Sequence, residues 1–146
     1  MKLSTEGCRE RQKRFSAVLA EKELDGAIIA QREHVYYFTG YLHNPLHSAV
    51  LLFTNDGCAV LAADDGITEP MDTLAIDKFV GYPASRFCTM HCLQLHEATH
   101  ALTSSVPSGS FGADFIGMAA IIMLGINNPK DLSLEILRLR KSKHPD

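Results

Sequence analysis

The feature that constrains the fold most is a β-hairpin predicted over residues 48–63. Two short apolar runs, residues 48–54 and 58–63, flank the tripeptide Asn55-Asp56-Gly57. An Asp-Gly pair supplies the positive φ angles that a tight antiparallel turn needs. Residues 27–30 form another short apolar run, which is typical of a strand buried on both faces. The sequence therefore predicts a sheet that contains these three strands.

The other predicted elements alternate between helices and strands, which favours an α/β fold. Residues 4–24 have the pattern of an amphipathic helix, with Ser4 or Thr5 as its N-cap. The charged run at 9–14 within it is interpreted as a solvated helix face. The run at 115–124 is ambiguous between a helix and a helix–strand passage. Further predicted elements are a short helix at 31–37, a strand at 76–82, a helix at 87–105, a short strand at 110–113 and a helix at 134–141.

The composition fits one globular domain and argues against several classes of partner. The chain has 146 residues, 46% of them hydrophobic, with a formal net charge of −3 and a pI near 6.1. These values do not suggest binding to nucleic acid or to an anionic membrane surface. No apolar stretch is long enough to span a bilayer. The spacing of Cys8, Cys58, Cys88 and Cys92 matches no disulfide framework or zinc ribbon, so we interpret them as reduced thiols of a cytoplasmic protein.

The sharpest chemical motif is the pentapeptide H-E-A-T-H at residues 96–100. On a helix, His96 and His100 would face the same way and could both reach one zinc ion, with Glu97 as the general base. A catalytic zinc needs a third protein ligand, for which Glu135 is a candidate and Asp114 a weaker one. The alternative is an amphipathic helix whose histidines sit at the edge of its apolar side.

Several segments along the chain follow one another in a recognisable order. A leading helix is followed by L-D-G-A-I-I, H-V-Y-Y-F-T-G-Y, A-V-L-L-F-T-N-D-G and A-V-L. Together they resemble the N-terminal domain of the creatinase/prolidase/aminopeptidase P family. The resemblance implies a mixed six-stranded β-sheet flanked by helices, similar to the ribonuclease H fold. Residues 1–130 would form this domain, and residues 131–146 would form an exit helix and linker toward a C-terminal catalytic domain outside this sequence. Arg140 and Lys143 match the family's basic junction.

The resemblance also implies a function. The chain would be the non-catalytic N-terminal domain of a metal-dependent Xaa-Pro dipeptidase, an aminopeptidase P or a creatinase-like hydrolase. Its partners would be its own catalytic domain and a second copy in a homodimer. No catalytic residue, metal or cofactor is assigned to this chain, whereas two divalent metal ions (Mn, Co or Zn) are expected in the catalytic domain. The residues implied at the rim of the substrate cleft are Tyr37, Thr39, Tyr41, His43 and His47.

Two other functions stay open from the sequence. One is a small zinc hydrolase that uses His96, Glu97 and His100. The other is a stand-alone binding module with the same fold. A metal ion could also be bound by His43 and His47, which lie four apart in a loop, although no carboxylate or thiol follows them at short range.

Overall fold

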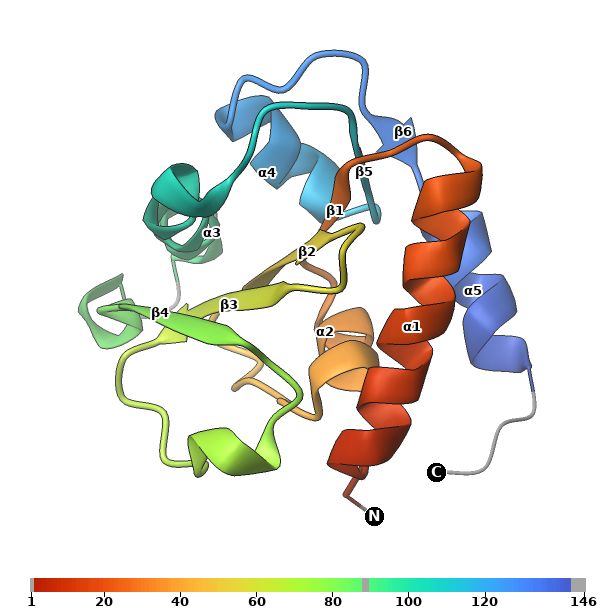
Figure 1. Ribbon diagram of the computed structural model, residues 1–146. Helices are drawn as coiled ribbons and strands as arrows, with labels where there is room; N and C mark the ends of the chain where they lie inside the picture. The colour runs from red at the N-terminus through yellow and green to blue at the C-terminus, as the bar shows by residue number, and fades with distance from the viewer. Residues whose placement is uncertain (1, 88–89, 143–146) are drawn as a thin grey trace.

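A computed structural model of the protein describes residues 2–87 and 90–142. These residues form one mixed sheet of six strands: β1 (Gly26–Ile29), β2 (Val50–Thr54), β3 (Ala59–Asp64), β4 (Lys78–Tyr82), β5 (Phe111–Ala113) and β6 (Lys130–Asp131). The strand order is β4-β3-β2-β1-β5-β6 (Figure 1). The neighbours β1–β2 and β2–β3 are antiparallel, and the other three pairs are parallel. The predicted mixed six-stranded sheet is confirmed.

Helices cover both faces of the sheet (Figure 1). One layer contains α1 (Thr5–Glu21), α2 (Arg32–Thr39) and α5 (Ser133–Lys141), and the other contains α3 (His91–Ala101) and α4 (Gly117–Met123). Three short 3-10 helices lie in the connections: Met71–Thr73, Ala84–Phe87 and Thr103–Ser105. The domain therefore has two hydrophobic cores, one on each side of the sheet.

Alternate residues of the central strands face opposite cores. Leu51 and Phe53 of β2 belong to the core beneath α1, α2 and α5, whereas Val50 and Leu52 belong to the core beneath α3 and α4. All four side chains are buried. Because both faces are covered, the strand sequence is apolar throughout and shows no polar alternation.

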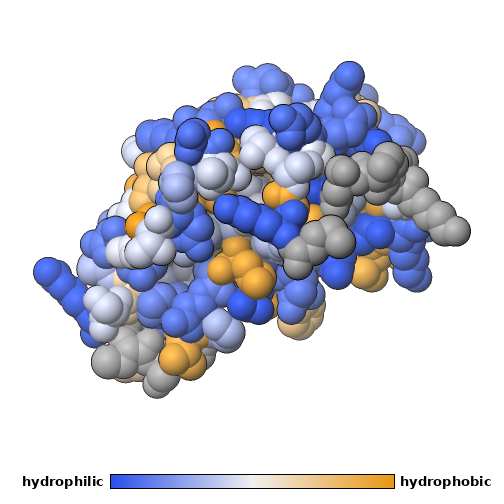
Figure 2. Space-filling model, turned by 90° about the horizontal axis from the view of Figure 1, so that it is seen from below, coloured by the Kyte–Doolittle hydropathy of each residue, from blue (hydrophilic) through white to orange (hydrophobic). Residues whose placement is uncertain are grey.

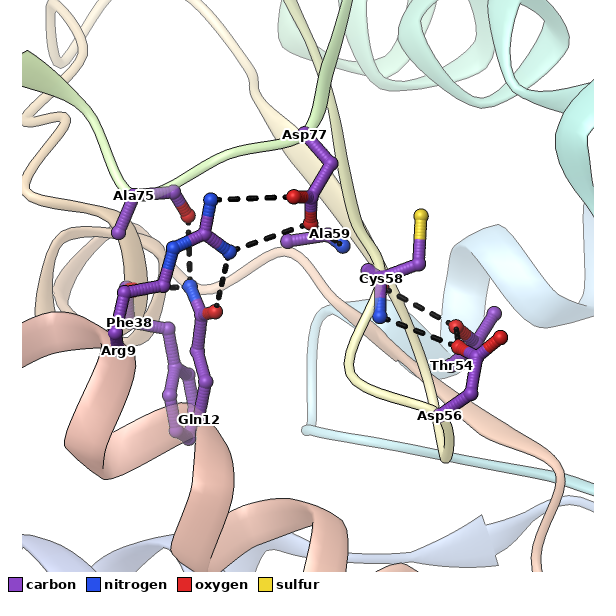
Figure 3. Close-up of polar contacts among 9 residues, drawn as sticks. All are labelled: Arg9, Gln12, Phe38, Thr54, Asp56, Cys58, Ala59, Ala75 and Asp77. Carbon is purple, nitrogen blue, oxygen red and sulfur yellow. Dashed lines mark hydrogen bonds and ion pairs between the residues drawn. The ribbon is translucent and has the colours of Figure 1, made fainter. Parts of the chain in front are cut away.

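The predicted hairpin is confirmed, but its turn differs in detail from the expected one. β2 and β3 pair with Val50 opposite Ala62. In the turn only Gly57 has a positive φ, of 92°, and Asp56 does not. The Asp56 carboxylate instead accepts hydrogen bonds from the backbone amide of Cys58 at 3.2 Å and from the hydroxyl of Thr54 (Figure 3). Asp56 thus supports the turn through its side chain, and the glycine supplies the left-handed backbone.

Helix α1 begins where the sequence predicts, but it buries part of its charged run. Ser4 is the N-cap, and its hydroxyl accepts a hydrogen bond from the Gly7 amide at 3.0 Å. Within residues 9–14, Arg11 and Gln12 are buried, so the interpretation of the whole run as a solvated face is wrong. The Arg11 guanidinium donates to the carbonyl of Tyr37 at 3.2 Å and lies 4.8 Å from the centre of that ring. It therefore joins α1 to α2 inside the domain.

Gln12 is the centre of a second contact between α1 and the rest of the fold (Figure 3). Its amide nitrogen donates to the carbonyls of Phe38 at 2.8 Å and Ala75 at 2.7 Å. Its amide oxygen accepts from Arg9 at 2.9 Å, and Arg9 also forms an ion pair with Asp77 at 3.2 Å. This network fastens α1 to the end of α2 and to the segment that leads into β4.

Three other regions sharpen or correct the sequence predictions. The helix predicted at 87–105 is shorter in the structure: α3 spans His91–Ala101, and a 3-10 turn follows it. The ambiguous run at 115–124 contains helix α4. The sequence does not predict β6, because two residues carry no periodic signal. Cys8 and Cys58 are free thiols, while Cys88 and the side chain of Cys92 lie outside the described residues.

The surface is mainly polar on the face shown in Figure 2. Hydrophobic side chains are visible there only in small separate groups. No helix in the described part of the chain is both long and apolar enough to cross a membrane.

Candidate functional site: a cleft at the carboxyl edge of the central strands

Strands β1 and β5 are parallel, so their carboxyl ends meet at one edge of the sheet. Asp114, the residue after β5, is fully buried at this edge. Its carboxylate accepts hydrogen bonds from the backbone amides of Ala30 at 3.1 Å, Gln31 at 2.9 Å and Gly117 at 2.7 Å. One side chain thereby holds the end of β1 against the first turn of α4.

His34 of α2 completes this buried cluster. Its Nδ1 lies 3.0 Å from Oδ2 of Asp114. Because a carboxylate accepts, Nδ1 carries the hydrogen in this contact. The Nε2 atom is buried and has no hydrogen-bond partner among the described residues. The sequence predicts Asp114 only as a weak candidate zinc ligand. The signal for its structural role is an acidic residue between a short strand and a helix that begins with glycine.

The aromatic segment before the loop packs within the domain. The Tyr37 hydroxyl donates to the carbonyl of Leu139 in α5 at 3.1 Å. Thr39 is buried, and its hydroxyl donates to Val35 and accepts from the amide of Tyr41 at 3.0 Å. Burial also raises the pKa of Tyr41 to about 12, so this phenol stays protonated at neutral pH. Tyr37 and Tyr41 therefore pack against other parts of the domain.

The chain then reverses at Gly40, whose φ of 80° ends α2 in the left-handed conformation. The loop that follows borders a cleft of about 310 Å³ beside the carboxyl end of β1. Two of the five rim residues implied by the family resemblance, His43 and His47, line this cleft, and the other three are not among its lining residues. The lining residues are Ala30, Arg32, His43, Pro45, His47, Ser48, Leu95 and Ile116.

The polar side chains of the cleft have defined positions. Arg32 donates from Nε to the carbonyl of His43 at 2.7 Å. His47 places Nδ1 3.5 Å from the carboxylate of Asp64. His43 is buried, with Nδ1 3.0 Å from the carbonyl of Asn44. Burial lowers the pKa of His43 and outweighs the hydrogen bond to the Asn44 carbonyl, which acts in the opposite direction, so this imidazole is neutral at pH 7.

The H-E-A-T-H motif lies elsewhere, on the exposed side of α3. The rings of His96 and His100 are parallel with centroids 6.4 Å apart, as expected for residues four apart on a helix. Of the two predicted third ligands, Glu135 forms an ion pair with Lys22 at 3.1 Å across α5 and α1, and Asp114 is held at the sheet edge. Within the described residues, no group of three His, Cys, Asp or Glu side chains could hold a metal ion. The zinc hypothesis therefore lacks the third ligand that the sequence offered.

The fold and the cleft define an α/β domain with a potential ligand site at the carboxyl ends of its central parallel strands. Residues 11–105 match the model of the Creatinase/Prolidase N-terminal domain family, which is well over half of the chain. The protein belongs to this family. A comparison with curated proteins finds no match.

Solved structures show the same fold in Xaa-Pro peptidases. A proline dipeptidase from Streptococcus pneumoniae matches with a TM-score of 0.69 and 15% identity, over 90% of this chain and 98% of that one. An Xaa-Pro aminopeptidase (aminopeptidase P) from Streptococcus thermophilus matches with a TM-score of 0.63 and 14% identity, over 91% and 98%. The prolidase from Pyrococcus horikoshii matches with a TM-score of 0.65 and 17% identity, over 92% of this chain but only 36% of that one.

Proposed function

We propose that this chain is the non-catalytic N-terminal domain of a metal-dependent Xaa-Pro dipeptidase, aminopeptidase P or creatinase-like hydrolase. The observation that carries the proposal is how little of the Pyrococcus horikoshii prolidase this chain matches. Nearly all of this chain corresponds to about a third of that chain, as one domain of a larger protein would. The chemistry would then belong to a catalytic domain of the same protein. That domain would hold the two divalent metal ions, Mn, Co or Zn.

Within such a protein, the cleft beside β1 supports a role at the substrate entrance. His43 and His47 lie in an irregular loop at the carboxyl edge of the sheet, where α/β domains commonly bind ligands. Both ends of the loop are attached to regular elements: α2 ends just before Gly40, and β2 begins shortly after Ser48. These elements fix the position of the loop. We assign this loop to the rim of the substrate cleft, and we assign the domain a part in a homodimer.

The test is a hydrolysis assay with Ala-Pro, an Xaa-Pro tripeptide and creatine, one substrate for each proposed class of enzyme, on the 146-residue chain and on the full-length natural protein. We expect no turnover by the chain with added Mn²⁺, Co²⁺ or Zn²⁺, and turnover by the full-length protein that a chelator abolishes. Chelator-sensitive turnover by the chain alone would contradict the proposal. In that case His100→Ala would show whether the α3 histidines are responsible. Light scattering of the full-length protein tests the homodimer, and a monomer would refute that part.

A further inference from the structure

We propose that the cleft beside β1 binds the terminal carboxylate of a short peptide whose last residue is apolar, with Arg32 as its anchor. The inference deepens the proposed function and rests on it for the source of the ligand. It depends on three properties of the cleft: an arginine without an acidic partner, a lining without carboxylates and an apolar wall.

Arg32 is held in position by a hydrogen bond that does not use its outer nitrogens. Its Nε donates to the carbonyl of His43 at 2.7 Å, and His43 itself is buried. Among the described residues, the two terminal nitrogens of Arg32 have no hydrogen-bond or ion-pair partner. A guanidinium fixed at Nε presents its remaining N–H groups to a carboxylate with little loss of conformational entropy.

The rest of the polar lining is compatible with an anion. No Asp or Glu is among the lining residues. The nearest described carboxylate to His47 is that of Asp64, which already contacts this imidazole at 3.5 Å. Ser48 is fixed by its backbone, because its amide donates to the Tyr82 hydroxyl at 3.1 Å. Its own hydroxyl has no partner in the described structure and is available to donate to a ligand.

The remaining walls are apolar and come from separate parts of the chain. Pro45 lies in the loop, Leu95 on α3 and Ile116 just before α4. Ile116 is 38% exposed, so a ligand in the cleft would cover apolar surface that is now in contact with water. A volume of about 310 Å³ is at the small end for ligand sites and suits a group of one or two residues. A carboxylate attached directly to an apolar body is the chemistry that matches these walls and Arg32 together.

The test is an NMR titration of the ¹⁵N-labelled chain. The ligands are Ala-Pro, its carboxamide, which lacks the free carboxylate, and octanoate as a lipid-derived carboxylate. The variants are Arg32→Gln and, as a matched control, Arg138→Gln, which removes an exposed arginine on α5.

We expect Ala-Pro to shift the amide resonances around Ala30, Arg32 and Ser48 with a Kd on the order of 1 mM. Arg32→Gln should weaken binding about tenfold or more, Arg138→Gln should leave it unchanged, and the carboxamide should not bind. Any of three results overturns the inference. The amide resonances do not shift when the Ala-Pro concentration is ten times the expected Kd, the carboxamide binds as tightly as Ala-Pro, or octanoate binds more tightly than Ala-Pro. The ligand comparison uses wild-type protein, so it decides the matter even if Arg32→Gln fails to fold.

This experiment separates the two proposals. If the chain does not bind Ala-Pro but the full-length protein hydrolyses it, only the carboxylate site is refuted. If the chain binds Ala-Pro at the cleft but the full-length protein has no chelator-sensitive turnover, the cleft stands and the proposed function fails.

Discussion

Replacing Asp114 by alanine should destabilise the domain more than any change to an exposed acidic residue. The carboxylate is fully buried and accepts from three backbone amides and from His34 Nδ1, at 2.7 to 3.1 Å for the closest contact of each. Alanine removes the acceptor and leaves all four donors in place. The effect therefore comes from donors without partners as well as from the lost attraction.

The magnitude follows from the number of donors left unsatisfied. Each buried donor without an acceptor costs roughly 1–3 kcal/mol, so four at the lower end cost about 4 kcal/mol. The wild-type domain pays a desolvation penalty to bury the Asp114 carboxylate, and alanine removes that penalty. This gain offsets part of the cost of the unsatisfied donors. We expect the free energy of unfolding to fall by about 3–5 kcal/mol, against a total of about 5–15 kcal/mol for a typical domain.

The assay is urea unfolding followed by circular dichroism, with Asp131→Ala as the matched control. Asp131 is exposed and accepts one hydrogen bond, from the Ser133 amide at 2.9 Å at the start of α5. Its replacement should cost about 1 kcal/mol, because it removes one hydrogen bond at an exposed position. If Asp114→Ala costs no more than Asp131→Ala, the buried carboxylate does not organise this edge of the sheet, and the reasoning is refuted.

Three further outcomes are expected. Because burial lowers the pKa of His43, the unfolded chain takes up a proton at this residue more readily than the folded domain. The free energy of unfolding should therefore be highest above about pH 6.5 and should decrease as the pH falls below that value. His43→Leu should make the free energy of unfolding, measured in urea titrations, depend less on pH. Gln12→Leu should cost about 2 kcal/mol by leaving two carbonyls unpaired, whereas Arg9→Gln, at a partly exposed ion pair, should cost under about 1 kcal/mol in the same assay. Elemental mass spectrometry should find equal zinc content in the wild-type chain and in His96→Ala; a stoichiometric zinc lost in the variant would restore the zinc hypothesis.

Local signals predict much of this fold. The Asn55-Asp56-Gly57 turn between two apolar runs predicts the hairpin because glycine at the last position permits the left-handed backbone found at Gly57. Ser4 predicts the start of α1 because its hydroxyl can satisfy an amide of the first turn. These features depend on neighbours within a few residues, which the sequence displays directly.

The candidate site is less visible because its parts meet only in three dimensions. Asp114 acts on Ala30 and Gln31, more than 80 positions earlier in the chain. Gln12 is buried because two carbonyls from other elements converge on it, and no periodicity of α1 reveals this. The family resemblance predicts His43 and His47 at the rim of a substrate cleft, and both line the cleft beside β1. Arg32, which the sequence assigns to the preceding helix, becomes relevant only when the loop folds back over it.

The strand order has a consequence for how the chain folds as it is synthesised. β1 lies between β2 and β5 in the sheet. The β2 partner follows β1 within about 30 residues of the chain. The β5 partner comes much later, because Gly26 of β1 pairs with Phe111, which lies 85 residues further on. At about 5–20 residues per second, a ribosome needs about 4–17 s to add that segment. During this interval one edge of a wholly apolar strand has no partner strand, and such an edge can pair with other chains. The nascent domain should therefore depend on chaperones until β5 emerges, and arrest of translation just before residue 111 should give a species that aggregates.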